Sequence, residues 1–357
     1  MKKLIDYKDS IRKCSKCGLC QAVCPLYKIT GSDCTVSRGQ FIMLKGVLDG
    51  KIKLNDKVNR YLDLCLKCGA CSKFCPSGID VVDVISAAKY EYFKTHKSER
   101  INSFLKKHLI FGLLTGIAGL FHKKSKSKNF QKKVLYFGGC GSKITGTDSI
   151  VKLLNKMNIE VITPNFSCCG IWAYTSGDLD TFNKYIDSFI SEVKKYDIKE
   201  IVTSCASCEK ALKDYIRHTE DDAKKEILSE LNIKSIYSYI SENKLTIKLK
   251  KSITATYHKP CNTFDFESIE YVLNNTENLN YIKMEDYDTC CGLNILSDLK
   301  EYKIASKIFA NKRKCIEKSG VNIVLTTCLG CVATLKINSK GKYKVFDLLE
   351  FLAKNVE

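Results

Sequence analysis

The spacing of the cysteines constrains this chain more than any other feature of its sequence. Eighteen of its 20 cysteines fall into four blocks. Two blocks read C-x-x-C-x-x-C-x-x-x-C-P, and they contain Cys14, Cys17, Cys20 and Cys24, and Cys65, Cys68, Cys71 and Cys75. The other two have a single cysteine, then Cys-Cys-Gly, then C-x-x-C, and they contain Cys140, Cys168, Cys169, Cys205 and Cys208, and Cys261, Cys290, Cys291, Cys328 and Cys331. A chain that groups its thiols in this way is expected to bind metal.

The triple C-x-x-C spacing of the first two blocks predicts iron–sulfur clusters. Three cysteines at this spacing wrap a short turn of chain around three corners of a [4Fe–4S] cube, and the fourth ligand comes from the other block. The expected ligands are Cys14, Cys17, Cys20 and Cys75 for one cluster, and Cys65, Cys68, Cys71 and Cys24 for the other. A zinc site uses one or two C-x-x-C pairs and has no need of this triple spacing. The sequence therefore predicts two clusters of ferredoxin type.

The Cys-Cys-Gly blocks indicate a different kind of site. Adjacent cysteines are poorly placed to fill two corners of one tetrahedral ion, but they can serve neighbouring irons in a more open cluster. The glycine that follows lets the backbone pass close to it. A vicinal disulfide, or a zinc site built from four of the five cysteines, is the alternative. Cys34 and Cys315 lie outside all four blocks and are expected to be incidental thiols.

An internal repeat divides the C-terminal two thirds of the chain. Cys140 and Cys261 are 121 residues apart, and Cys205 and Cys328 are 123 apart. Apolar runs that precede cysteines predict strands at 134–137, 200–204, 253–257 and 322–327, and amphipathic runs predict helices at 179–196 and 299–318. We therefore expect a duplicated α/β cysteine-rich domain with a mostly parallel sheet in each copy.

The N-terminal region is expected to fold differently. The residues between the two ferredoxin-type blocks have helical patterns at 38–48 and 56–64. The predicted fold class is an α-helical ferredoxin domain followed by the duplicated cysteine-rich domain. The expected domains are 1–96 for the ferredoxin part, 97–132 for a helical linker, and 133–250 and 251–357 for the two cysteine-rich copies.

The linker contains an uncharged apolar run with two alternative interpretations. Residues 109–121 carry no charge and are flanked by Lys106-Lys107-His108 and His122-Lys123-Lys124. As a helix the run spans roughly 20 Å, too short for a hydrocarbon core of about 30 Å. It can lie in a membrane interface or pack as a linker helix between domains.

Composition narrows the choice of partners and compartment. The formal net charge is +19, but only six of the 58 basic residues are Arg, the residue that nucleic-acid sites favour. Thiolates bound to iron also carry negative charge, so no nucleic-acid partner is expected. The chain has 20 cysteines, most of them grouped for metal binding, and its N-terminus lacks an apolar leader; together these features predict a reducing cytoplasm.

The order of blocks resembles the iron–sulfur subunit of glycolate oxidase and related subunits of anaerobic glycerol-3-phosphate dehydrogenase, lactate utilisation systems and heterodisulfide reductase. The resemblance extends from about Ile11 to Leu352. It includes Ser37-Arg38-Gly39-Gln40 with the stretch 44–50, Cys75-Pro76-Ser77-Gly78-Ile79, and His258-Lys259-Pro260-Cys261.

The resemblance implies an oxidoreductase subunit that transfers electrons. Electrons would come from a flavoprotein dehydrogenase acting on a 2-hydroxy acid (glycolate or lactate) or on glycerol 3-phosphate, and pass to a quinone or another acceptor. Peripheral attachment to the inner face of the cell membrane is compatible with a quinone acceptor. The alternative is a heterodisulfide reductase-like thiol–disulfide oxidoreductase, with catalysis at the cysteine-rich domains.

By the same resemblance, the cysteine-rich domains hold one or two further [4Fe–4S] clusters, non-cubane in form. The first set of ligands would be Cys140, Cys168, Cys169, Cys205 and Cys208. The second would be Cys261, Cys290, Cys291, Cys328 and Cys331. Both sets of five are complete in this chain.

Overall fold

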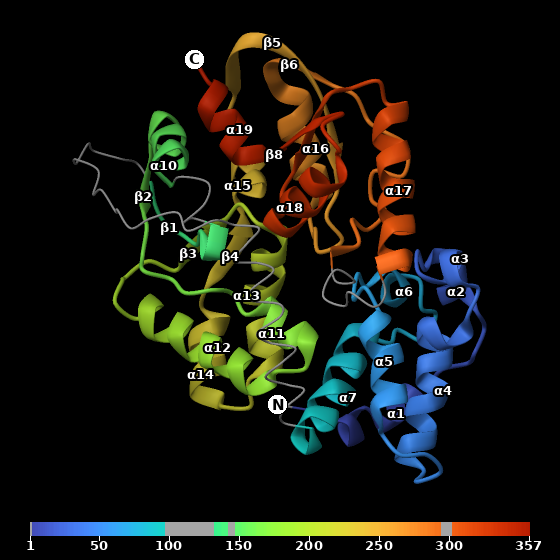
Figure 1. Cartoon of the computed structure of the whole chain (residues 1–357). Helices are drawn as coiled ribbons and strands as arrows, with labels where there is room; N and C mark the ends of the chain where they lie inside the picture. Colours follow the sequence, from blue (N-terminus) through green and yellow to red (C-terminus); the bar gives the residue numbers. More distant parts are fainter. Residues whose placement is uncertain (1, 97–131, 142–146, 294–301) are drawn as a thin grey trace. The chain divides into compact units, whose positions relative to one another are not determined.

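The computed structural model describes residues 2–96, 132–141, 147–293 and 302–357 (Figure 1). The chain separates into two compact units. The first unit takes Met1–Leu113, Ile171–Phe182 and Thr289–Lys312, and the second takes Leu114–Gly170, Asn183–Asp288 and Arg313–Glu357. The apolar run 109–121 lies outside the described residues, as does nearly all of the expected linker, so the domain limits stay a prediction. Within the described ranges, no helix is both long and apolar enough to cross a membrane.

The N-terminal part of the first unit is built from helices, as the sequence predicts. Its elements are η1 (Leu4–Tyr7), α1 (Lys8–Arg12), α2 (Leu19–Val23), α3 (Tyr27–Thr30), η2 (Asp33–Thr35), α4 (Ser37–Leu48), α5 (Asp56–Leu64), α6 (Ala70–Lys73) and α7 (Val81–Thr95). The two helices predicted for this region, at 38–48 and 56–64, are found at α4 and α5, within one residue of their expected bounds. Each of α5 and α7 starts at a side-chain cap, Asn55 and Asp80 respectively, which accepts from backbone N–H groups of the first turn.

The core of this part borders directly on cysteines. Leu44, Leu62 and Val84 come from three different helices and are fully buried in one apolar cluster. Cys14, Cys65, Cys71 and Cys75 pack against the same cluster. The thiols of both ferredoxin-type blocks are therefore shielded from water on one side by apolar side chains.

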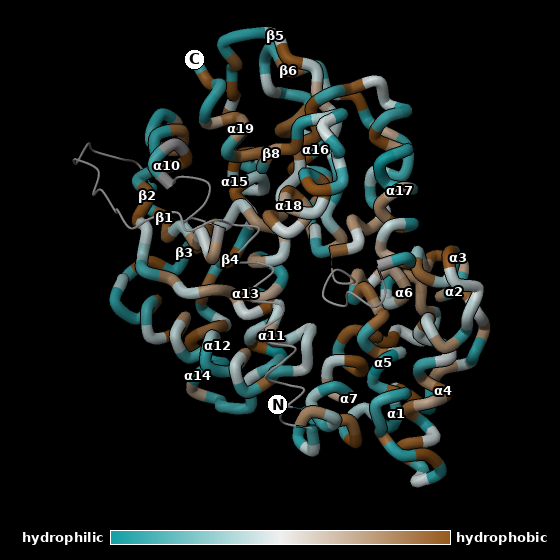
Figure 2. The backbone as a smooth tube through the Cα atoms, in the orientation of Figure 1, coloured by the Kyte–Doolittle hydropathy of each residue, from teal (hydrophilic) through white to brown (hydrophobic). Residues whose placement is uncertain are grey.

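The second unit contains two four-stranded parallel sheets. The elements that lie wholly within it are β1 (Lys132–Tyr136), η3 (Gly139–Gly141), α10 (Thr147–Lys156), β2 (Ile159–Ile162), β3 (Glu200–Thr203), α13 (Ala206–His218), α14 (Asp222–Ser229), β4 (Asn232–Ser235), α15 (Ile236–Glu242), β5 (Ile247–His258), α16 (Phe266–Asn275), β6 (Thr276–Tyr281), β7 (Ile323–Thr326), α18 (Leu329–Asn338), β8 (Lys344–Asp347) and α19 (Leu348–Asn355). Helix α11 (Ile171–Ser176) belongs to the first unit, and α12 (Leu179–Val193) and α17 (Tyr302–Lys318) have residues in both. Hydrophilic and hydrophobic residues alternate along α17 (Figure 2), the amphipathic pattern from which it was predicted.

The two sheets have the same strand order, which confirms the predicted duplication. The first sheet is ordered β2-β1-β3-β4 and the second β6-β5-β7-β8, and every strand pair in both is parallel. Helices of each copy also pack on helices of the other. Helix α10 of the first copy packs on α19 of the second, and α16 of the second packs on α15 of the first. Because α10 and α16 occupy equivalent places, as do α15 and α19, this packing has the form of a two-fold relation between the copies.

One apolar core joins the two copies. It includes Val134 and Val202 from the first sheet and Leu325 from the second, together with Leu348 and Leu352 of α19. All five side chains are fully buried. At about 1.5–3 kcal/mol for each buried aliphatic side chain, this shared core makes separation of the two copies costly.

Candidate iron–sulfur centres

The structure gathers the eight cysteines of the first two blocks around two neighbouring cavities of the first unit. The first cavity has about 410 Å³ of open space, and the candidate ligands Cys14, Cys17, Cys20 and Cys75 line it. The second has about 420 Å³, and Cys24, Cys65, Cys68 and Cys71 line it. Each group joins three cysteines of one block with one cysteine of the other, the pairing that the spacing predicts. Cys71 also lines the first cavity, so the two cavities adjoin.

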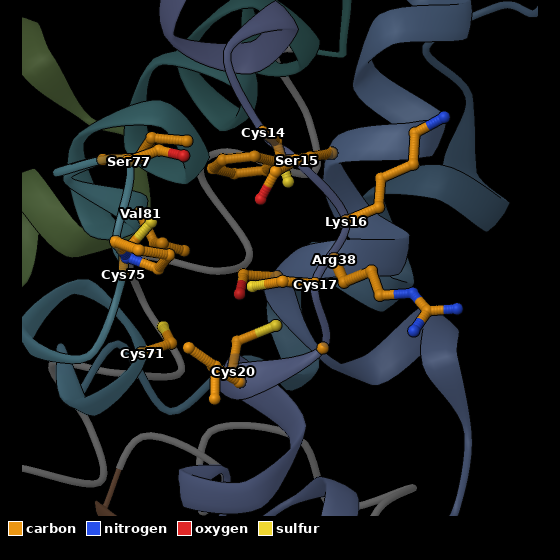
Figure 3. Close-up of a pocket in the computed structure, with 16 residues that line it drawn as sticks. Cys14, Ser15, Lys16, Cys17, Cys20, Arg38, Cys71, Cys75, Ser77 and Val81 are labelled. Atoms are coloured by element: carbon orange, nitrogen blue, oxygen red, sulfur yellow. The ribbon is translucent and has the colours of Figure 1, made fainter.

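Left-handed backbone positions aim the thiols of each block inward. The residues before the second cysteine, Lys16 and Lys67, have φ values of 59° and 51°. The residues after it, Gly18 and Gly69, have φ values of 86° and 71°. Two reversals of this kind within four residues curl the chain around a point rather than along a helix axis. In Figure 3 the sulfurs of the labelled cysteines surround a common space, while Lys16 and Arg38 extend away from it.

The cysteines of the second cavity are half-buried, and for three of them burial changes the acidity of the thiol. Burial raises the pKa of Cys24 to about 11, raises the pKa of Cys65, and raises that of Cys71 well above its usual range. A buried thiol ionises only when a cation compensates the thiolate, and a bound metal does this. Four converging thiols held this way fit an iron–sulfur cluster, which when bound supplies a one-electron couple.

Cys17, at the first cavity, lies in the opposite environment. The structure describes all twenty cysteines, and Cys17 is the exposed one among them. A hydrogen bond from the backbone N–H of Leu19 lowers the pKa of its thiol, with Ser15 acting in the same direction. The first cavity therefore reaches solvent through the loop that carries Cys17.

The first Cys-Cys-Gly block converges within the second unit. Hydrogen bonding to Cys168, together with burial, raises the pKa of Cys140 far above its usual range. Hydrogen bonding to Cys169, and then to Cys205, raises the pKa of Cys208. Because Cys168 and Cys169 are adjacent in the chain, these contacts connect all five expected ligands of the first set.

Local backbone features place these five cysteines. Cys205 is the cap residue of α13, so Cys208 lies in the first helical turn. Gly139 has φ of 56°, and a Cβ there would lie 3.0 Å from the Cys208 sulfur, so only glycine lets this loop pass so close. The buried Tyr215 hydroxyl donates to the carbonyl of Cys169 at 2.9 Å, which anchors the Cys-Cys segment.

The second set is distributed differently. Cys261, Cys328 and Cys331 belong to the second unit, whereas Cys290 and Cys291 belong to the first. Cys328 caps α18 as Cys205 caps α13. The glycine N–H of each Cys-Cys-Gly, at Gly170 and at Gly292, donates to the first sulfur of its own pair at 3.5 Å.

Two thiol contacts join blocks that the sequence analysis treats as separate. Within the second unit, hydrogen bonding to Cys208 lowers the pKa of Cys205, but hydrogen bonding to Cys328 and burial outweigh it and raise that pKa to about 12. Within the first unit, hydrogen bonding to Cys290 lowers the pKa of Cys68 to about 7. Spacing along the chain contains no signal for either contact, because each depends on how distant segments pack.

The remaining cysteines lie away from the cavities. Cys34 is half-buried in η2 and lines neither of the two cavities. The Cys315 sulfur, half-buried in α17, lies 3.8 Å from a carboxylate oxygen of Asp286.

Comparison with known proteins identifies the domains. Residues 10–79 match the family described as 4Fe-4S dicluster domain, and residues 134–213 and 255–336 each match the family described as cysteine-rich domain. The chain therefore matches the first of these domain families once and the second twice. Its N-terminal region is thus an iron–sulfur domain, and the predicted fold class and family resemblance are confirmed.

Relatives of known name are similar over most of the chain. A probable glycolate oxidase iron-sulfur subunit of Bacillus subtilis is 24% identical, over 97% of this chain and 94% of its own. A fumarate reductase (CoM/CoB) subunit from Methanothermobacter marburgensis is 26% identical, over 97% and 73%. A subunit of the dihydromethanophenazine:CoB–CoM heterodisulfide reductase from Methanosarcina mazei is 24% identical, over 78% and 77%.

A solved structure shares the fold. The crystal structure of a hypothetical protein from Helicobacter pylori aligns with a TM-score of 0.54, over 88% of this chain and 67% of its own, at 13% identity. At that identity the likeness concerns the fold alone.

Proposed function

We propose that the chain is the iron–sulfur electron-transfer subunit of an oxidoreductase. It takes electrons from a flavoprotein dehydrogenase that oxidises a 2-hydroxy acid, such as glycolate or lactate, or glycerol 3-phosphate, and it delivers them to a quinone or another acceptor. The observation that carries this proposal is the pair of adjoining cavities, each lined by its four candidate ligand cysteines. The full-length similarity to a glycolate oxidase iron-sulfur subunit supports the choice of partner.

In this proposal the groups of cysteines have different roles. Four would hold a [4Fe–4S] cluster in each cavity, Cys14, Cys17, Cys20 and Cys75 in the first and Cys24, Cys65, Cys68 and Cys71 in the second. The exposure of Cys17 makes the first cavity the place where the partner flavoprotein approaches. The contact of Cys68 with Cys290 leads from the second cavity to a Cys-Cys-Gly block, which is the direction in which electrons leave.

The two sets of five cysteines would hold one or two further clusters of more open form. The contacts among Cys140, Cys168, Cys169, Cys205 and Cys208 support a site in the first copy. A quinone acceptor would bring the protein to the inner face of the cell membrane, where the partner subunit or the run 109–121 can make the contact.

A second function is favoured by a specific observation. The Cys205 and Cys328 thiols come from equivalent places in the two copies and are hydrogen-bonded to each other. A pair of thiol sites facing one another suits reduction of a disulfide, and one relative is a heterodisulfide reductase subunit. In that case catalysis occurs at the cysteine-rich domains, and the chain itself is an enzyme.

The experiment begins with iron and acid-labile sulfide analysis of the full chain purified without oxygen. About eight irons indicate the two ferredoxin-type clusters alone, and about sixteen indicate four four-iron clusters. Reduction of the chain is then followed by EPR after addition of glycolate, d-lactate or glycerol 3-phosphate together with a flavoprotein dehydrogenase for each.

The two functions give different results in this experiment. Rapid reduction with one substrate pair supports the electron-transfer role. Failure with all three, combined with turnover of a low-molecular-weight disulfide by the chemically reduced chain, would favour the disulfide reductase. A chain without iron would refute both.

A further inference from the structure

The two ferredoxin-type blocks carry lysine at the same position, in opposite environments. Lys16 precedes Cys17 and Lys67 precedes Cys68, and both have left-handed backbone conformations. Lys16 is exposed, and Figure 3 shows its side chain extending away from the sulfurs of the first cavity. Lys67 lines the second cavity and is only 7% exposed. Burial of a lysine is expensive unless something compensates its charge.

A buried lysine is usually paired with a carboxylate, but the described surroundings of Lys67 do not supply one. Its Nζ donates to the carbonyls of Cys65 at 3.3 Å and Leu62 at 3.5 Å. Among the residues that the structure describes, no carboxylate forms an ion pair with it. Lys89, another buried lysine of the same unit, does have such a partner in Asp63. Lys67 is thus a buried cation whose nearest ionisable neighbours are thiols.

The charge of Lys67 and the thiols of the cavity act on each other. Lys67 and Cys65 line the same cavity, and water has little access to the Lys67 side chain, so its charge and that of a thiolate there are poorly screened from each other. The backbone N–H of Lys67 also donates to the Cys65 sulfur at 3.4 Å. Net charge, hydrogen bonds to sulfur and solvent exposure are the properties by which a protein sets the reduction potential of a cluster.

We propose that the Lys67 ammonium is the counter-ion of the cluster in the second cavity and raises its reduction potential. Reduction adds one negative charge, and a fixed cation in a poorly screened site favours the more negative state. Lys16 faces solvent, where its charge is screened, and leaves the first cavity almost unaffected. Lys67 therefore favours the reduced state of the cluster in the second cavity, whose ligand Cys68 contacts Cys290. This inference rests on the proposed function, because it requires a bound cluster.

The test is an EPR-monitored redox titration of the anaerobically purified full chain. Lys67→Met should lower one reduction potential by about 59 mV, which is a tenfold change in a one-electron equilibrium constant. Lys67→Arg retains the charge and should shift that potential by less than about a third as much. Lys16→Met is the matched control and should leave both potentials close to their original values.

If Lys67 acts only as a C-terminal cap of α5, the variants should give different reduction potentials from those just described. Equal shifts in Lys67→Met and Lys16→Met, or a shift in Lys67→Arg as large as in Lys67→Met, would overturn the proposal. If Lys67→Met loses iron, Lys67→Gln replaces it, because its amide can still donate to the carbonyls. Loss of iron in both uncharged variants but not in Lys67→Arg supports the counter-ion, whereas loss in Lys67→Arg as well overturns it. A parent chain that binds no iron refutes the proposed function instead.

Discussion

Replacement of Gly39 by alanine tests how tightly η2 packs on α4. Gly39 is buried in the first turn of α4, where alanine would ordinarily stabilise a helix by about 1 kcal/mol. A Cβ at this position would lie 2.1 Å from the carbonyl oxygen of Asp33, and ordinary contact begins at 3.4 Å. The backbone of η2 must therefore move by 3.4 − 2.1 = 1.3 Å.

A displacement of that size exceeds what side-chain rotation can absorb, because the obstructing atoms belong to the main chain. Overpacking typically costs about 1–3 kcal/mol, and a clash with main-chain atoms belongs at the upper end of that range, so we expect a net destabilisation of about 2 kcal/mol after the gain in helix propensity. Ser37 and Arg38 of the same helical turn line the cavities, and Ser37 lines both. Gly39→Ala should therefore also lower the iron content of the purified chain.

The assay compares urea midpoints and iron content of anaerobically purified variants. Gly46→Ala is the matched control in the same helix, since its Cβ would meet only the flexible side chain of Ile52, at 3.2 and 3.3 Å. We expect Gly46→Ala to be neutral or slightly stabilising. If Gly39→Ala keeps its iron and unfolds at the same urea concentration as the parent or a higher one, the close approach of η2 to α4 is wrong.

Three further predictions follow from single residues. Cys75→Ser should remove about four irons per chain, whereas Cys34→Ser should remove none, and iron analysis of both variants would expose an error in the assignment. Tyr174→Phe removes a hydrogen bond to the Asp83 carboxylate within the first unit and should cost about 2 kcal/mol by urea denaturation; an unchanged midpoint contradicts the contact. Burial raises the pKa of Asp347 to about 7, so the folded chain holds this proton more tightly than the unfolded chain, and the unfolding free energy should fall by about 1.4 kcal/mol per pH unit from pH 4 to 7 and then level off. Asp347→Asn keeps the cap of α19 and should lose this contribution, so the difference between variant and parent should grow with pH up to 7.

The helices and inner strands could be predicted because their patterns are local. The predicted 56–64 helix has the observed bounds of α5, and the 200–204 strand is β3 with one residue fewer. The edge strands β2, β4, β6 and β8 were not predicted, since polar residues interrupt their apolar runs. The 179–196 helix ends earlier, at Val193, because its last residues form a turn.

The candidate site, like the fold, could be predicted only in part. Cysteine spacing predicts four ligands for each cluster, since a ligand block reports its own geometry through the number of residues between ligands. Each set lines one cavity, but Cys71 lines both, which the spacing did not predict. It could not predict that Lys67 is buried while Lys16 is exposed, because the two occupy the same place in identical motifs. The sequence does show that both motifs have lysine directly before the second cysteine, and this shared residue could have prompted a comparison of the two lysines.

The sequence by itself determined the kind of chemistry, since thiols at these spacings suit iron and sulfide and the repeat of about 122 residues requires a duplicated domain. The tertiary structure decided which groups lie beside those thiols. The contacts of Cys68 with Cys290 and of Cys205 with Cys328 join residues more than 120 positions apart. Burial, charge compensation and contact between distant thiols are properties of packing, and packing is not encoded in any one segment of the chain.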